Sequence, residues 1–186
     1  MIYPVIAYGD PILKKVAAEI KQEGDIDVKE IAANMFDTMY EASGVGIAGP
    51  QVGISKRIFV IDSNLMLDED SKEEGMKMVF INPEIVEEDG DDWGYEEGCL
   101  SIPGIRGEIF RPERITLSWF DENWVKHEKE FDGMTARVIQ HEYDHLDGIL
   151  FTEMLSPLKR RLLKGKLDKI TKGQCNYDYK MKFYKK

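Results

Sequence analysis

The most informative segment of the chain is Gln140-His-Glu-Tyr-Asp-His145, which contains the pattern H-E-x-x-H. Residues four apart on a helix lie on one face, so the imidazoles of His141 and His145 can bind one metal ion. Glu142, one residue further round the helix, can reach a metal-bound water as a general base without being a ligand. The segment therefore predicts a divalent-metal hydrolytic site, against the alternative of two partly exposed histidines on an ordinary helix.

The helix that carries this motif is expected over residues 134–147, ended by Gly148. A further amphipathic helix is expected over 156–170. Its inward-facing side chains are expected to be Leu158, Leu162, Leu163, Leu167 and Ile170.

Toward the N-terminus the pattern predicts two helices followed by strands. One helix starts at Asp10 as N-cap with Pro11 in its first position, and a longer one starts at Asp27 and stops at Gly44. Strands are expected at residues 57–61, 78–81, 115–120 and 124–131, the second ended by Asn82-Pro83 and the last two joined as a hairpin.

Strand runs between separated helices, rather than alternating strand–helix–strand units, indicate an α+β domain. We expect mainly antiparallel sheets around a central metal-binding helix, with N-terminal helices and a C-terminal helix. The 186 residues suit a single catalytic domain over 1–170, followed by a basic C-terminal tail over 171–186.

The formal net charge of −10 is unevenly spread. Residues 157–186 contain eleven Lys or Arg and two Asp, a balance of +9, so the rest of the chain carries −19. An acidic body argues against binding to DNA, whereas the basic segment could dock on one anionic partner. The alternative for this segment is a solvated amphipathic helix with a frayed tail.

The composition also bears on where the protein works. The N-terminus lacks the charged and apolar regions of a secretory signal, and no apolar run approaches the ~20 residues of a membrane span. Two cysteines are too few for a disulfide framework. We therefore expect a cytoplasmic protein without a membrane partner.

A catalytic metal ion needs a third protein ligand, for which the chain offers Cys99, Cys175, His127 or a carboxylate. Cys99 lies in a non-helical setting four residues before Pro103, and a thiolate is a strong ligand for soft and borderline metals. Cys175 lies in the polar C-terminal part, and His127 suits an ordinary surface position. Alone, Cys99 would be read as a small buried hydrophobe, but beside H-E-x-x-H we favour ligation.

The third unusual segment is Gly44-Val-Gly-Ile-Ala-Gly-Pro-Gln51, which is too glycine-rich for a regular element. Its glycines permit close approach of a substrate main chain, and it matches neither phosphate-binding glycine pattern. The Gln51 amide could donate to a developing oxyanion. A structural turn with a surface glutamine is the alternative.

Three segments together resemble, in order and spacing, the signature motifs of the peptide deformylases: Gly44-Val-Gly-Ile-Ala-Gly-Pro-Gln51, Glu97-Gly-Cys-Leu-Ser101 and Gln140-His-Glu-Tyr-Asp-His-Leu-Asp-Gly148. The similarity extends from the start of the chain to about residue 170. The main departure is Gly49, where the family usually has alanine, and it is expected to loosen the loop slightly. Arg137 replaces an apolar residue of some relatives, at the rim of the expected pocket.

The resemblance implies a metallo-amidohydrolase that acts on linear amides. It would remove the formyl group from the N-terminal formyl-methionine of nascent polypeptides during protein biosynthesis and release formate. A metal-bound hydroxide would attack the formyl carbon, with Glu142 as general base and then general acid. The side-chain amide of Gln51 and the backbone N–H of Leu100 would hold the oxyanion with the metal.

The resemblance also implies the ligand set and the partners. Cys99, His141 and His145 would hold one divalent ion, with Fe²⁺ as the native metal and Zn²⁺, Ni²⁺ or Co²⁺ as alternatives. The partners would be formyl-methionyl nascent peptides. Because these emerge from ribosomes, the basic C-terminal segment could dock on ribosomal RNA.

For substrate binding the expectation rests on residues near the motif helix and the glycine segment. Val138 lies one turn before His141 and Met134 one turn earlier, so both could line a methionine pocket. The backbone of Gly46 and Ile47 could pair with the peptide as an added strand. Arg106 resembles a family position near the substrate, with a plain surface arginine as the alternative.

Three rival functions stay open at this level. The chain could be an H-E-x-x-H peptidase that cleaves internal peptide bonds, or a structural zinc protein with four closed ligands. It could also be an inactive relative that serves as a binding module. The complete set of candidate catalytic residues argues against the last.

Overall fold

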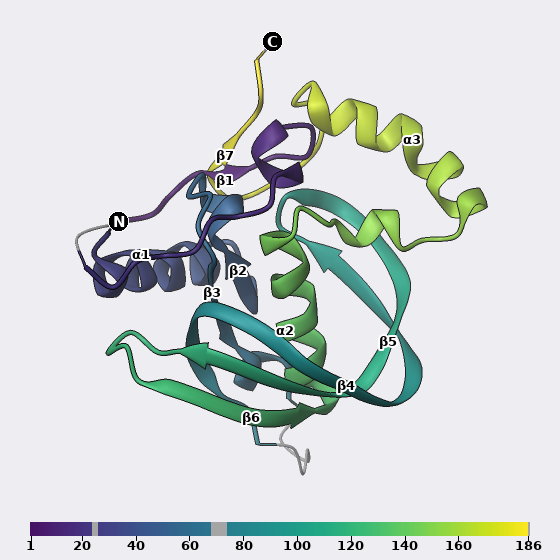
Figure 1. Ribbon diagram of the computed structural model, residues 1–186. Coiled ribbons are helices and arrows are strands. Elements are labelled where there is room, and N and C mark those ends of the chain that lie inside the picture. Colours follow the sequence, from purple (N-terminus) through teal and green to yellow (C-terminus); the bar gives the residue numbers. More distant parts are fainter. Residues whose placement is uncertain (24–25, 68–73, 186) are drawn as a thin grey trace.

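The computed structural model describes residues 1–23, 26–67 and 74–185, and these form an α+β fold (Figure 1). Within them the α-helices are α1 (Val28–Glu41), α2 (Gly133–Leu146) and α3 (Pro157–Thr171). The strands are β1 (Val5–Ile6), β2 (Gly46–Ala48), β3 (Ile58–Asp62), β4 (Lys77–Cys99), β5 (Ile102–Phe120), β6 (Lys126–Asp132) and β7 (Met181–Lys182). Short 3₁₀ turns are η1 (Pro11–Lys14), η2 (Gly49–Val52), η3 (Ser63–Met66) and η4 (Phe151–Glu153).

The predicted antiparallel sheets around a central helix are confirmed. In the described residues β2, β3, β4, β5 and β6 form one antiparallel sheet in that order, and β1 pairs in parallel with β7. Helix α2 lies at the centre, between β2–β3 and the long β4–β5 ribbon (Figure 1). No helix in the described part of the chain is long and apolar enough to cross a membrane.

The largest part of the core fixes α2 against the sheet. The rings of Phe59 and Phe80 stack with centroids 4.6 Å apart, and Trp119 lies 5.0 Å from Phe80. Ala136 and Ile139 of α2 are fully buried in the same cluster. Aromatic side chains of this size dominate the free energy of core packing. One face of α2 is therefore anchored, and this determines where its polar face points.

Both predicted N-caps are present, but one predicted helix is mostly absent. Asp27 accepts hydrogen bonds from the first backbone N–H groups of α1, and Asp10 accepts one from Ile12. The chain after Asp10 makes only the four-residue turn η1. It then runs extended, because the N–H of Ala17 bonds to the carbonyl of Leu146. A tertiary hydrogen bond overrides the local helical pattern here.

Strand β4 is much longer than predicted. It does not end at Asn82-Pro83 but continues to Cys99, paired with β5 throughout. Asn82 adopts a positive φ of 47°, and the register shifts between Ile81 and Glu84. A β-bulge accommodates proline within a strand, so a proline that signals a strand end in the sequence here marks a bend.

The glycine-rich segment does form regular structure, contrary to the prediction. Residues Gly46–Ala48 are strand β2, paired with β3, and Gly49–Val52 are η2. Gly49 is closely packed in this loop. A Cβ at Gly49 would lie 2.7 Å from the carbonyl oxygen of Ile54, so the backbone passes too closely for alanine.

The predicted limits of helix α3 agree with the structure to within one residue, but fewer of its apolar side chains are buried than expected. Leu167 and Ile170 are buried, whereas Leu158 and Leu162 are 67% and 71% exposed. The residues after α3 return to the body of the protein. The N–H of Val5 donates to the carbonyl of Lys180 at 2.8 Å, so this segment is part of the fold.

Candidate active site

The polar face of α2 and the end of β4 meet at one point. Cys99, the last residue of β4, places its Sγ 3.4 Å from Nε2 of His145. The ligand atoms of Cys99, His141 and His145 all lie within 4.8 Å of one another. The structure thus brings together the three residues that the sequence indicated as metal ligands, while Cys175 and His127 lie outside this cluster in the described residues.

The orientation of His141 fits a metal ligand. Its Nδ1 lies 2.9 Å from Oε2 of Glu97, so a proton on Nδ1 donates to this carboxylate and Nε2 keeps its lone pair. Metal-binding histidines are usually held by such a carboxylate. One thiolate and two imidazoles suit Fe²⁺, Zn²⁺, Ni²⁺ or Co²⁺, and three protein ligands are typical of catalytic rather than structural sites.

Glu142 lies beside this cluster and is buried, with 4% of its surface exposed. Its Oε2 has no hydrogen-bond partner within the described residues. Burial raises the pKa of Glu142 to about 7. Its carboxylate rests on β2, because a Cβ at Gly46 would lie only 2.6 Å from Oε1. A carboxylate with a pKa near neutrality can both accept and return a proton.

Gln51 is buried, not the surface glutamine of the alternative interpretation. Its Oε1 accepts a hydrogen bond from the N–H of Ala48 at 2.8 Å, which fixes the direction of the amide. Its Nε2 therefore faces Cys99 Sγ at 3.4 Å and Ser101 Oγ at 3.3 Å. The amide donor of Gln51 lies next to the cluster of metal-ligating atoms.

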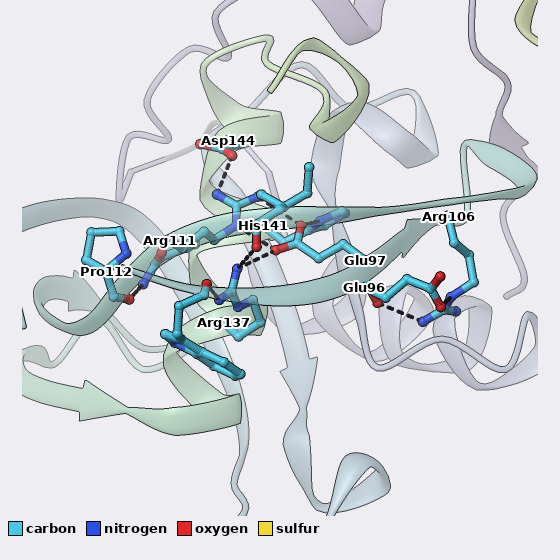
Figure 2. A network of polar contacts seen from close by, with 11 residues as sticks. Glu96, Glu97, Arg106, Arg111, Pro112, Arg137, His141 and Asp144 are labelled. Atoms are coloured by element: carbon cyan, nitrogen blue, oxygen red, sulfur yellow. Dashed lines mark hydrogen bonds and ion pairs between the residues drawn. The ribbon is translucent and has the colours of Figure 1, made fainter. Parts of the chain in front are cut away.

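Beneath the site lies a buried charge network that the sequence analysis missed (Figure 2). Arg111 donates to both oxygens of Glu97, at 2.7 and 3.0 Å, and to Asp144 at 2.7 Å. These bonds and the bond from His141 outweigh burial and hold the pKa of Glu97 well below its usual range. The position of Glu97 two residues before Cys99 is the only hint in the sequence, since Arg111 and Asp144 are brought in by the fold.

Arg137 belongs to the same network. It donates from Nη1 to Glu97 Oε1 at 3.1 Å and from Nη2 to the carbonyl of Trp93 at 2.6 Å, and its guanidinium lies 4.3 Å above the indole of Trp93. Only 2% of Arg137 is exposed. Both Nη atoms are hydrogen-bonded, whereas Nε has no hydrogen-bond partner within the described residues. The apolar stem and these bonds from the two Nη atoms accommodate an arginine in this buried position.

The site opens into a cavity of about 510 Å³. Of the residues predicted to contact substrate, Gly46, Arg106 and Val138 line it, whereas Ile47 of β2 is fully buried and is not among the lining residues. Met134 is not among the residues that line this cavity. Arg106 lies at its exposed rim, with Nε 3.1 Å from a carboxylate oxygen of Glu96 (Figure 2).

The cavity has a further wall that the sequence did not indicate. It is formed by Asn176, Tyr177, Asp178 and Tyr179, in the segment expected to be a tail. The hydroxyl of Tyr179 donates a hydrogen bond of 2.6 Å to the backbone carbonyl of Leu100. The sequence of residues 171–186 is polar, and only its four aromatic residues, Tyr177, Tyr179, Phe183 and Tyr184, hint that it docks.

The sequence and the fold are both similar to those of one protein family. The sequence model of the polypeptide deformylase family matches residues 2–161. The chain is 56% identical to a peptide deformylase of Cytophaga hutchinsonii and 51% identical to one of Christiangramia forsetii, covering 98% of this chain in both cases and 98% and 96% of those proteins. The fold is similar to a crystal structure of a peptide deformylase from Legionella pneumophila, with a TM-score of 0.80, 40% identity, and 94% of this chain and 98% of that chain covered.

Proposed function

The chain belongs to the peptide deformylase family, and on this premise we propose which of its residues carry the reaction. Enzymes of this family are hydrolases that remove the formyl group from the N-terminus of nascent polypeptides. In our proposal Cys99, His141 and His145 bind one divalent metal ion. The observation that carries it is the meeting of three ligand atoms within 4.8 Å, beside a buried carboxylate.

We propose Fe²⁺ as the native ion, with Zn²⁺, Ni²⁺ or Co²⁺ as alternatives, and the donor set fits all four. When bound, such an ion polarises the formyl carbonyl and lowers the pKa of a water molecule toward ~7. A reduced thiol at Cys99 is a condition for this site. A reducing compartment such as the cytoplasm meets that condition, and we assign the protein there.

Glu142 then acts as general base and general acid. It accepts a proton from the water that attacks the formyl carbon, and its pKa of about 7 allows it to hold that proton at neutral pH. It delivers the proton to the amine nitrogen as the carbon–nitrogen bond breaks, and formate leaves. The Nε2 of Gln51 and the backbone N–H of Leu100 donate to the oxyanion during the attack.

The peptide binds along β2 in this proposal. Strand β2 is an edge strand of the described sheet, so the backbone of Gly46 and Ile47 can pair with an extended substrate. Val138 forms part of the apolar wall for the methionine side chain, with Met134 further along the same helix. Arg106 at the rim lies where the later residues of the peptide would pass.

The assignment is tested by comparing two substrates on the same sample. Formyl-Met-Ala-Ser should be hydrolysed, whereas an internally quenched peptide with blocked ends should not be cut. Cleavage of the blocked peptide alone would identify an endopeptidase and overturn the proposal. Metal analysis of Cys99→Ala and His141→Ala should show loss of the ion from both variants. Full metal occupancy in either variant would refute the ligand set.

We further propose that α3 docks the enzyme on ribosomal RNA. Its lysines and arginines are all exposed, whereas the rest of the chain is acidic. Lys159, Arg160 and Lys164 replaced together by glutamine should weaken co-sedimentation with ribosomes at low salt. The matched control replaces three exposed lysines elsewhere, at positions 15, 21 and 126. Equal loss of binding in both triple variants would exclude a specific role for α3.

A further inference from the structure

The connection between β4 and β5 lies at the centre of the proposed site. Cys99 pairs with Ile102, so Leu100 and Ser101 form the tight turn between the two strands. The carbonyl of Leu100 therefore lies outside the β4–β5 ladder. A turn residue without ladder bonds depends on other contacts to fix its two peptide planes.

Distant segments of the chain hold this turn. Gln51 donates toward Cys99 and Ser101 from one side, and the N–H of Tyr8 donates to the carbonyl of Ser101 at 2.8 Å. The carbonyl of Leu100 is held by the hydroxyl of Tyr179 at 2.6 Å. Each of the three consecutive residues thus has a contact from another part of the fold.

Tyr179 is itself held firmly in place. It is partly buried and packs in the same apolar cluster as Leu100, with the ring of Tyr177 6.5 Å away. Beyond it, β7 is bonded to β1, with the N–H of Ala7 donating to the carbonyl of Lys182 at 2.9 Å. Burial raises the pKa of Tyr179, so its hydroxyl remains a donor across the neutral range. The hydrogen bond to Leu100 therefore connects the turn to an anchored strand.

We propose that Tyr179 is a positioning residue for deformylation: by holding the carbonyl of Leu100 it fixes the peptide plane that follows Leu100, and so restricts the turn whose preceding plane carries the Leu100 N–H. This inference rests on the proposed function, in which that N–H is one of the oxyanion donors. It also extends the catalytic unit beyond residue 170, the limit expected from the sequence. Asn176 to Tyr179 line the cavity together with Leu100 of the turn. The segment that forms this wall therefore also contains the residue that positions the backbone N–H of Leu100.

The test is the variant Tyr179→Phe, which removes one oxygen and keeps the ring. Removal of a complete oxyanion donor costs about 10²–10³ in rate. Loss of the bond that orients a donor should cost less, so we expect kcat for formyl-Met-Ala-Ser to fall about 10-fold or more. Because the lost interaction is made in the transition state, KM should change by no more than about 2-fold. Metal content should be unchanged.

Tyr184→Phe is the matched control. Tyr184 lies five residues away in the same C-terminal segment, 45% of its surface is exposed, and it is not among the residues that line the cavity. Its kcat and KM should equal those of the unmodified enzyme. In addition, the backbone amide resonance of Leu100 should shift in Tyr179→Phe and stay in place in Tyr184→Phe.

The possible results distinguish a failure of the proposed function from a failure of the inference about Tyr179. An unmodified enzyme that holds metal but does not deformylate would overturn the proposed function. An active enzyme in which Gln51→Ala loses rate but Tyr179→Phe keeps its kcat would overturn only this inference. The inference also fails if Tyr179→Phe raises KM alone, because Tyr179 would then only line the cavity. Loss of folding in Tyr179→Phe would likewise contradict it, since the residue would be structural.

Discussion

At the scale of single residues, the site depends on how closely the backbone of β2 approaches the side chain of Glu142. The carboxylate lies directly over Gly46, where any side chain would occupy its place. Glu142 is buried, and its Oε2 lacks a hydrogen-bond partner in the described residues. The position of the carboxylate is therefore set by contact with a glycine rather than by hydrogen bonds.

The substitution Gly46→Ala tests this contact. A Cβ at Gly46 would lie 2.6, 2.8 and 2.9 Å from three atoms of the Glu142 side chain, so the carboxylate must move. Because a displaced general base loses part of its 10²–10⁴-fold effect, we expect kcat/KM to fall by about 10-fold or more with metal content unchanged.

The control for this substitution is Gly165→Ala on α3, where a new Cβ meets nothing within 4 Å. It should leave activity intact and stabilise the helix by ~1 kcal/mol. If Gly46→Ala were as active as the control, the close contact would have no role in placing Glu142.

At the scale of elements, the buried ion network ties α2 to the β4–β5 ribbon. Arg111 from β5 bridges Glu97 of β4 and Asp144 of α2, and all three side chains are largely withdrawn from solvent. Removal of one partner from a buried ion pair leaves an uncompensated charge. The network therefore makes the strands and the helix depend on each other for stability.

We expect Arg111→Met to lower the free energy of unfolding by about 3–5 kcal/mol, measured by urea denaturation. The matched control is Arg114→Met in the same strand. Arg114 pairs with Asp89 at the same distance of 2.7 Å, but this pair is exposed and should contribute little. An equal loss of unfolding free energy in the two variants would show that burial of an ion pair does not determine how much it contributes to stability.

The hairpin between β5 and β6 offers a pH-dependent test. The Asp121 carboxylate accepts hydrogen bonds from the N–H groups of Asn123 and Val125, and it lies 2.9 Å from Nε2 of His127. Burial alone would raise the pKa of Asp121, but the bonds from His127 and the two N–H groups outweigh it and lower this pKa from its ordinary 3.8.

A carboxylate whose pKa is lowered by folding stabilises the protein above its unfolded pKa and loses this effect as the pH falls through its folded pKa. The unfolding free energy of the unmodified protein should exceed that of Asp121→Asn at pH 7. The difference should shrink as the pH is lowered from about 4 to about 2. A difference that stays constant over that range would show that the Asp121 charge does not stabilise the hairpin.

At the scale of the whole molecule, the cluster of Cys99, His141 and His145 and the central helix could be predicted from the sequence. A strict local pattern places His141, Glu142 and His145 on one helix, so their arrangement follows from helical geometry. Cys99 is the one member of the cluster that the fold must bring in. It was predicted because a thiolate is a strong ligand beside H-E-x-x-H, and its flanking residues also resemble a known motif. The helix motif and the residues that flank Cys99 are both short segments of sequence, so they can be identified without knowledge of the fold.

The parts that the sequence did not indicate depend on long-range contacts. Register shifts in the β4–β5 pairing break the period-two pattern, so a 23-residue strand was read as a four-residue one. The segment around Tyr179 docks through backbone hydrogen bonds and isolated aromatic rings, which leave no periodic signal. Arg111 and Arg137 are polar in sequence and buried in the fold, because their partners come from other elements.

The central claim is that Glu142 transfers the proton at a metal site made by Cys99, His141 and His145. The most direct measurement is kcat/KM for formyl-Met-Ala-Ser, with metal content determined on the same anaerobically purified samples of unmodified protein and Glu142→Gln. We predict equal metal content and a loss of about 10²–10⁴ in kcat/KM in the variant. Retained activity in Glu142→Gln, or loss of the metal together with activity, would contradict this account.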